Sequence, residues 1–164
     1  MQATRIELLQ QMPIFGAISA DVLQFLLEPA RSVFIPAGEF FFREKDEARC
    51  MYVLETGRVA VLKSWGEREF LVRHLGRGDC FGEMALLDLF PRSASVRAEE
   101  DSAAIELAPS HLYRLFERDA PQFALIQMNL GREMSRRLRE TNELLFRASM
   151  GEVPALSEHV FRPT

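Results

Sequence analysis

Between residues 30 and 108 the chain consists of short β-rich runs separated by clusters of glycine, proline and charged residues. Runs of roughly 4–8 residues with this punctuation are typical of a small all-β sandwich or barrel. Turn signals include Pro36-Ala37-Gly38 and Gly57, which separates two apolar runs in a tight connection. We therefore predict strands at residues 31–35, 39–43, 50–55, 58–63, 69–75, 94–99 and 102–107.

Helical periodicity flanks this β region on both sides. Apolar residues at helical spacing predict N-terminal helices within residues 4–28, interrupted at Pro13. A short helix is expected at 110–116, and Asp119-Ala120-Pro121 begins a long helix over 121–147. The expected architecture is mainly β with flanking helices, in one domain over residues 1–150. Within it the β part covers 30–108 and the C-terminal helices 109–147, and the aperiodic residues 151–164 are expected to form a tail.

The long helix carries an apolar stripe that recurs every three or four residues, with charged residues on the opposite faces. The stripe exceeds what a small β domain can cover, and such a stripe is usually buried against another helix. We therefore expect a homodimer through residues 121–147. The alternative is that the stripe packs only on its own β domain. Its members are Phe123, Ile126, Leu130, Met134, Leu138, Thr141 and Leu145.

Composition argues against several function classes. The formal net charge of −4 speaks against broad nucleic-acid affinity. No apolar run approaches the ~20 residues that span a bilayer, and the first residues lack the apolar region of a signal peptide. Cys50 and Cys80 form no CxxC pattern and are interpreted as small buried apolar residues of a reducing compartment. A cytoplasmic location without membrane contact is expected.

The histidines do not indicate catalysis. His74, His111 and His159 are isolated, one each on a strand, a helix and the tail, whereas a metal-dependent β-barrel enzyme needs clustered histidines with a carboxylate. No Ser–His–Asp or Cys–His spacing stands out. We expect no catalytic residue and no metal, and so no enzyme.

The irregular stretch from Phe81 to Val96 indicates a ligand site instead. Residues 84–87 leave room for barely one helical turn, and the unpaired N–H groups of such a turn favour an anion. Pro91 then ends the segment before Arg92, whose planar fork of donors suits a phosphate. Glu83 would disfavour a phosphate but would accept a hydrogen bond from a sugar hydroxyl. One sugar-phosphate would satisfy both groups, although either charge alone could be an ordinary surface residue.

The runs Phe81-Gly82-Glu83 and Pro91-Arg92-Ser93-Ala94-Ser95-Val96 resemble the phosphate-binding cassette of the cyclic nucleotide-binding domain family. This family includes the bacterial catabolite activator and the regulatory subunits of protein kinase A. Gly38, Gly57 and Gly78 coincide with its structural glycines, in turns that need a positive φ. The resemblance covers about residues 10–145. It implies an eight-stranded, jelly-roll-like β-roll with N-terminal helices, a short cassette helix and a long C-terminal helix that serves as dimer contact and lid.

The resemblance also implies a role for each cassette residue. Arg92 would bind the cyclic phosphate, helped by Ser93 and by the backbone N–H of Ala94. Glu83, with the backbone of Gly82, would take the ribose 2′-hydroxyl. In the empty site Glu83 and Arg92 could also pair with each other.

The remaining implied contacts come from the sheet and the long helix. Val61 and Val72 would cover the sugar or the base edge, and Arg137 would bond to the backbone of the cassette. The run around Met134-Ser135-Arg136-Arg137-Leu138 is similar to the activator's dimer helix, which places Thr141 at the adenine amine and Asn142 at the base bound by the other subunit. The alternative is that Thr141 packs by its methyl group or bonds back to the preceding turn.

The implied function is sensing of a cyclic mononucleotide, cAMP or cGMP, with ligand binding moving the C-terminal helix and signalling to an unidentified protein partner. Ser93 favours cAMP, because family members that favour cGMP often have Thr there. Arg73 departs from the activator and would stack on the base, bond to it or point to solvent.

Two alternatives to this function stay open. The chain could be a fragment or relative of an activator-type transcription regulator without its helix-turn-helix, or a β-roll that binds another effector. Only a short tail follows residue 147, so the chain alone is not expected to bind DNA.

Overall fold

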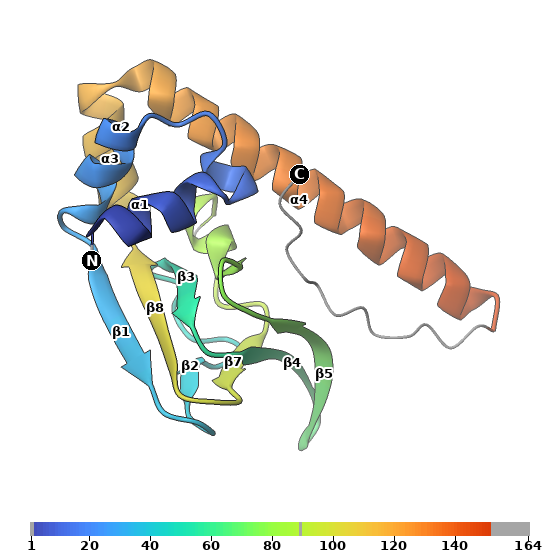
Figure 1. The fold of residues 1–164 in the computed structure, drawn as a ribbon. Coiled ribbons are helices and arrows are strands. Elements are labelled where there is room, and N and C mark those ends of the chain that lie inside the picture. Colours follow the sequence, from blue (N-terminus) through green and yellow to red (C-terminus); the bar gives the residue numbers. More distant parts are fainter. Residues whose placement is uncertain (1, 89, 152–164) are drawn as a thin grey trace.

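The computed structural model describes residues 2–88 and 90–151. In these ranges a β region lies between two helical segments (Figure 1). The strands are β1 Arg31–Ile35, β2 Phe40–Phe42, β3 Met51–Thr56, β4 Val59–Trp65, β5 Arg68–Leu75, β6 Cys80–Phe81, β7 Ser95–Ala98 and β8 Ser102–Leu107. The helices are α1 Gln2–Gln10, the 3-10 turn η1 Pro13–Phe15, α2 Ala20–Leu27, the 3-10 turn η2 Glu83–Leu86, α3 Pro109–Arg118 and α4 Ala120–Ser149.

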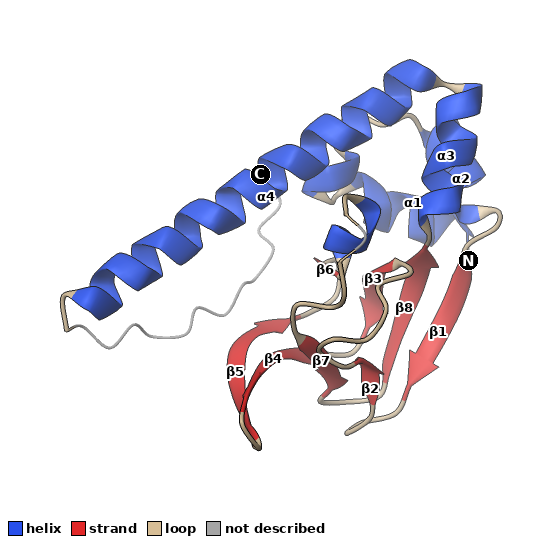
Figure 2. Ribbon diagram, turned by 180° about the vertical axis from the view of Figure 1, so that it is seen from behind, coloured by secondary structure: helices blue, strands red, loops and turns tan. Residues whose placement is uncertain are grey.

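The strands form two four-stranded sheets, in the orders β1-β8-β3-β6 and β2-β7-β4-β5 (Figure 2). All of the pairings are antiparallel. Apolar side chains of both sheets meet inside the roll, among them Leu54, Val59, Leu75 and Val96. This arrangement confirms the expected β-roll with flanking helices.

A second core lies where the helices close one end of the roll. Side chains of α1, α2, α3 and the first half of α4 pack against Met51, Val53, Ile105 and Leu107 of β3 and β8. Figure 1 shows α1, α2 and α3 gathered at this end, with α4 crossing it and continuing past the roll.

One buried polar residue fastens α4 to the segment around η1. Asn129 donates through Nδ2 to the carbonyl of Gly16 at 2.9 Å and to that of Ile14 at 3.5 Å. Its Oδ1 accepts from Arg132 Nη1 at 3.0 Å. Because a buried amide is costly unless its hydrogen bonds are made, these contacts fix the position of the helix at this point.

Helix α4 divides into a covered and an uncovered half. Asp119 caps its start by accepting from the Gln122 N–H at 3.0 Å. Ile126 and Leu130 are buried, but Leu138 and Leu145 are 61% and 64% exposed. The first half of the predicted stripe thus packs on its own domain, and the second half is left open in the single chain.

The element bounds differ from the predicted ones in a few places. Strand β6 was not predicted, because two residues are too few to show a period. The turn η1 was also missed, since its Pro13 was interpreted only as a stop. Helix α4 is longer than predicted at both ends. The tail expected at 151–164 lies, from residue 152 on, outside the described residues.

The predicted positive-φ glycines are confirmed. Gly38, Gly57 and Gly78 have φ values of 87°, 90° and 88°. At Gly57 a Cβ would lie 2.7 Å from the Cα of Ser102, so a side chain at this position would collide with β8 as well as strain the turn.

Candidate functional site

A cavity of about 350 Å³ lies between the segment 82–96, the β4–β5 pair and helix α4. Nine of the ten predicted site residues line it, and only Asn142 does not. The nine are Val61, Val72, Gly82, Glu83, Arg92, Ser93, Ala94, Arg137 and Thr141. Residues that lie far apart in the sequence are therefore brought together around one space.

The cassette begins at a glycine that no other residue could replace without strain. Gly82 has φ 72° and ψ 15°, in the left-handed region, and directly precedes η2. A Cβ at this position would lie 2.5 Å from Nη1 of Arg92. The missing side chain thus lets the guanidinium approach the backbone at the start of the turn.

Arg92 is a buried cation without a carboxylate partner in the described chain. It is 6% exposed. Its Nη1 donates to the Gly82 carbonyl at 3.2 Å, its Nη2 lies 3.7 Å from Cys50 Sγ, and its guanidinium stacks 3.9 Å from the ring centroid of Phe42. Its buried Nε has no hydrogen-bond partner. Such a group is costly in an empty site, and an anion in the cavity would relieve the cost.

Glu83 pairs with the long helix rather than with Arg92. It is 6% exposed and forms an ion pair with Arg137 of α4. Arg137 also donates from Nε to Glu133 at 2.9 Å and from Nη2 to the Cys80 carbonyl at 3.4 Å. The predicted bond from Arg137 to the backbone therefore falls on Cys80, just before the cassette.

This cluster of charges is held in a partly dry environment. Burial lowers the pKa of Arg137, but the nearby carboxylates of Glu83 and Glu133 outweigh it and raise that pKa above its ordinary value. Burial likewise raises the pKa of the Cys80 thiol to about 12, so this cysteine stays protonated at neutral pH. Both cysteines are buried, as expected.

Comparison with known proteins identifies one family for this chain. Residues 32–119 match the family model of the cyclic nucleotide-binding domain.

The chain belongs to this family.

Two curated relatives illustrate the range of cyclic nucleotide-binding proteins that it resembles. It is 30% identical over 131 residues to the cyclic AMP receptor protein of Thermus thermophilus, covering 79% of this chain and 59% of that protein. It is 32% identical over 107 residues to the cAMP-dependent protein kinase regulatory subunit of Emericella nidulans, covering 65% of this chain and 26% of that protein. The chain thus spans less than two thirds of the length of either relative.

A solved structure shows the same fold. The catabolite activator protein of Thermus thermophilus superposes with a TM-score of 0.74 at 30% identity, over 84% of this chain and 63% of that one.

Of the two α4 residues predicted to contact the base in this cyclic nucleotide-binding domain, one lines the cavity and the other does not. Thr141 lines the cavity, and its hydroxyl donates back to the Arg137 carbonyl at 2.9 Å, as in the alternative interpretation. Asn142 does not line the cavity, and its predicted contact would be with a base bound by a second subunit.

The sequence interpretation missed several contributors. Lys63 of β4 lines the cavity, pairs with Glu44 and donates from Nζ to the Ser93 carbonyl, so it holds the cassette in place. Its position opposite the cassette depends on the pairing of β4 with β7, which no local pattern reveals. The pair between Glu83 and Arg137 was missed for the same reason, since 54 residues separate its members.

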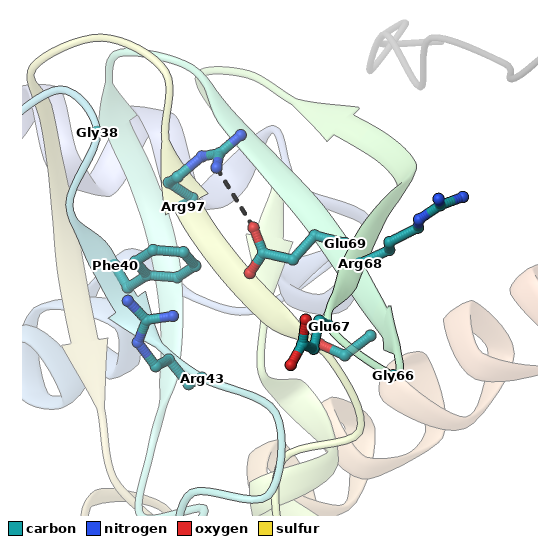
Figure 3. A pocket seen from close by; sticks show the side chains of 9 residues that line it. Gly38, Phe40, Arg43, Gly66, Glu67, Arg68, Glu69 and Arg97 are labelled. Atoms are coloured by element: carbon teal, nitrogen blue, oxygen red, sulfur yellow. Dashed lines mark hydrogen bonds and ion pairs between the residues drawn. The ribbon is translucent and has the colours of Figure 1, made fainter.

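A second hollow, of about 480 Å³, lies apart from the cassette on the outer side of β2, β7 and the β4–β5 hairpin (Figure 3). Its charges largely satisfy one another: Arg97 pairs with Glu69 at 3.4 Å, and Arg43 stacks 3.7 Å from the ring centroid of Phe40. We therefore place the candidate site at the cassette.

The described ranges contain neither a metal-binding group of side chains nor a membrane-spanning helix. Among residues 2–88 and 90–151 no three His, Cys, Asp or Glu side chains group as a metal would require. In the same ranges no helix has the length and apolar content to cross a bilayer.

Proposed function

We propose that this domain binds a cyclic mononucleotide in the cassette cavity and relays its presence through helix α4. The observation that carries the proposal is Arg92, a buried guanidinium with an unpartnered Nε, no carboxylate partner in the described chain and a place in the cavity wall. A cyclic phosphate supplies the missing acceptors. Ser93 and Ala94 also line the cavity, and the Ser93 hydroxyl and the backbone N–H of Ala94 would complete the coordination of the phosphate.

The ribose would be read by Glu83. Its carboxylate is held by Arg137 and keeps further lone pairs for a 2′-hydroxyl donor. Because the same carboxylate anchors α4, a ligand that reorients it also changes how the helix is held. Occupancy of the cavity would then shift the helix between two positions and alter the surface that it offers to a partner.

Two observations favour cAMP as the effector. Ser93 stands at a position where cAMP-binding members carry Ser or Ala, and both curated relatives named above carry cAMP in their names. Arg73 also lines the cavity, and a cation at this place favours a base other than adenine.

Calorimetric titration with cAMP and with cGMP, on protein freed of bound ligand by unfolding and refolding, tests the proposal. Arg92→Ala and Glu83→Ala should each lose about 1.5–3 kcal/mol of binding free energy, the usual value of a charge-assisted hydrogen bond. Arg43→Ala, which removes an exposed arginine outside the cavity, is the matched control and should bind as wild type does. Unchanged affinity in both cassette variants would falsify the assigned site.

A further inference from the structure

Arg73 reaches the cavity because of an irregularity in strand β5. Val61 pairs with Arg73, whereas the next residue of β4, Leu62, pairs with Leu71, so Val72 is an extra residue without a partner of its own. Side chains of a regular strand alternate between faces, and a bulge redirects one of them. As a result Val72 and Arg73, although adjacent in the sequence, both line the cavity.

Within residues 2–88 and 90–151, the half-buried side chain of Arg73 has neither a hydrogen bond nor an ion pair. Burial lowers the pKa of its guanidinium, and the charge of Arg137 acts in the same direction. The carboxylates nearby are engaged elsewhere: Glu83 with Arg137, and Glu140 with Arg136 at 2.6 Å. Arg73 is thus a cation in the wall of a ligand cavity, and its guanidinium N–H groups have no acceptor among the described residues.

The other polar groups of the cavity are already assigned to the phosphate or the ribose, or are bonded within the protein. Arg92, Ser93 and Ala94 are assigned to the phosphate and Glu83 to the ribose, and Lys63 is already held by Glu44 and the Ser93 carbonyl. The base is what remains. A guanine presents two acceptors side by side, O6 and N7, which match the planar fork of a guanidinium. An adenine presents N7 beside the N6 amino group, a donor that would face the N–H groups of the arginine.

We propose that Arg73 recognises the O6/N7 edge of a guanine base and that the domain therefore prefers cGMP to cAMP. The inference rests on the proposed function and is opposite to the preference suggested by Ser93. Ser93 is assigned to the phosphate, which is the same in both nucleotides, whereas Arg73 addresses the atoms in which the two bases differ.

Titrations with nucleotide analogues test which atoms are read. Wild-type protein should bind cGMP roughly tenfold or more tightly than cAMP, in the range expected for one bidentate contact. Cyclic IMP keeps O6 and N7 but lacks the 2-amino group, and it should bind as cGMP does. The 7-deaza analogue of cGMP, which lacks N7, should lose most of the advantage.

A substitution of Arg73 provides a second test of the base preference. Glutamine pairs with N6 and N7 of adenine, so Arg73→Gln should reverse the order of the two affinities. The matched control is Arg68→Gln, which removes an exposed arginine of the same strand outside the cavity and should leave the cGMP-to-cAMP ratio unchanged. Thermal unfolding of both variants checks that each is folded.

The titrations distinguish a wrong base assignment from a wrong proposed function. If cAMP binds at least as tightly as cGMP and Arg73→Gln leaves the ratio as it was, the base assignment is wrong and the proposed function stands. If neither nucleotide binds folded wild-type protein, the proposed function fails and the base assignment fails with it.

Discussion

At the scale of single residues, the cavity contains charge that the folded chain does not fully satisfy. Arg92 is buried with one nitrogen unpartnered, and Arg73 has no acceptor in the described chain. Groups of this kind lower stability and are expected where a ligand later supplies the missing partner. Two such groups in one cavity therefore indicate a ligand site, and their cost can be measured as a change in the free energy of unfolding when one of them is replaced.

Replacing Arg92 by methionine should separate stability from binding. Methionine fills a similar volume without a buried charge, and exchange of a buried charged group for an apolar one is often neutral or stabilising. We expect the free energy of unfolding of the ligand-free variant, measured in urea, to lie within about 1 kcal/mol of wild type or above it. Nucleotide binding should be lost. A loss of several kcal/mol of stability would instead give Arg92 a mainly structural role.

The sequence revealed the cassette side chains because their spacing is local, from Gly82 to Ala94. It did not reveal the partner of Glu83, because the pair with Arg137 depends on where α4 crosses the roll. Nor did it decide the direction of Arg73. That direction follows from a bulge, which is set by the pairing of two strands and not by the composition of either.

At the scale of elements, the cassette and α4 are joined by a chain of ion pairs. Arg137 contacts Glu83 on one side and Glu133 on the other, and Glu133 also accepts from Arg136 at 2.6 Å. Burial raises the pKa of Glu133, but the hydrogen bond from Arg136 and the charge of Arg137 outweigh it, so the pKa lies below its ordinary value of 4.5.

This shift predicts an acid dependence of stability. A carboxylate whose pKa is lower in the folded than in the unfolded state stabilises the fold at pH values above 4.5, and the contribution disappears as the pH falls through the folded-state pKa. Glu133→Gln should therefore be less stable than wild type at pH 7, and the difference should shrink below pH 4.5. Urea unfolding at a series of pH values measures it. A difference that does not change with pH would exclude the ionised form as the source.

Most elements follow from local patterns, and the exceptions are short. The predicted strands at 31–35 and 102–107 match β1 and β8, because each is a short run bounded by proline or charged residues that mark its ends. Strand β6 and the turn η1 have two and three residues and are created by their neighbours. Only the fold as a whole specifies such elements.

At the scale of the whole molecule, α4 extends beyond the roll and leaves apolar side chains uncovered (Figure 1). Leu138, Leu145, Phe146 and Met150 are each at least 61% exposed in the single chain. An apolar face of this length needs a cover, and a second copy of the same helix is the simplest one. We infer that two chains pair through this half of α4.

Sedimentation velocity at micromolar concentration should show a dimer. The double variant Leu138→Glu/Leu145→Glu should be monomeric and still folded, because both side chains are exposed in the single chain. Its unfolding temperature should be lower than that of wild type, since dimerisation no longer stabilises the folded state. Met128→Glu, at an exposed position on the other half of the helix, is the control and should remain dimeric. A monomeric wild-type protein would remove this interpretation of α4.

The hydrogen bonds from Asn129 to the carbonyls of Ile14 and Gly16 hold α4 at one point, about which the rest of the helix can turn. At about 1.5 Å per residue, Arg137 lies about 12 Å along the helix from this point and the end of α4, at Ser149, about 30 Å. A rigid helix that turned about Asn129 would magnify any displacement at Arg137 by roughly 2.5 at its free end. A shift of about 1 Å beside the cassette, the size of one altered hydrogen bond, would thereby become a movement of about 2.5 Å at the free end of the helix.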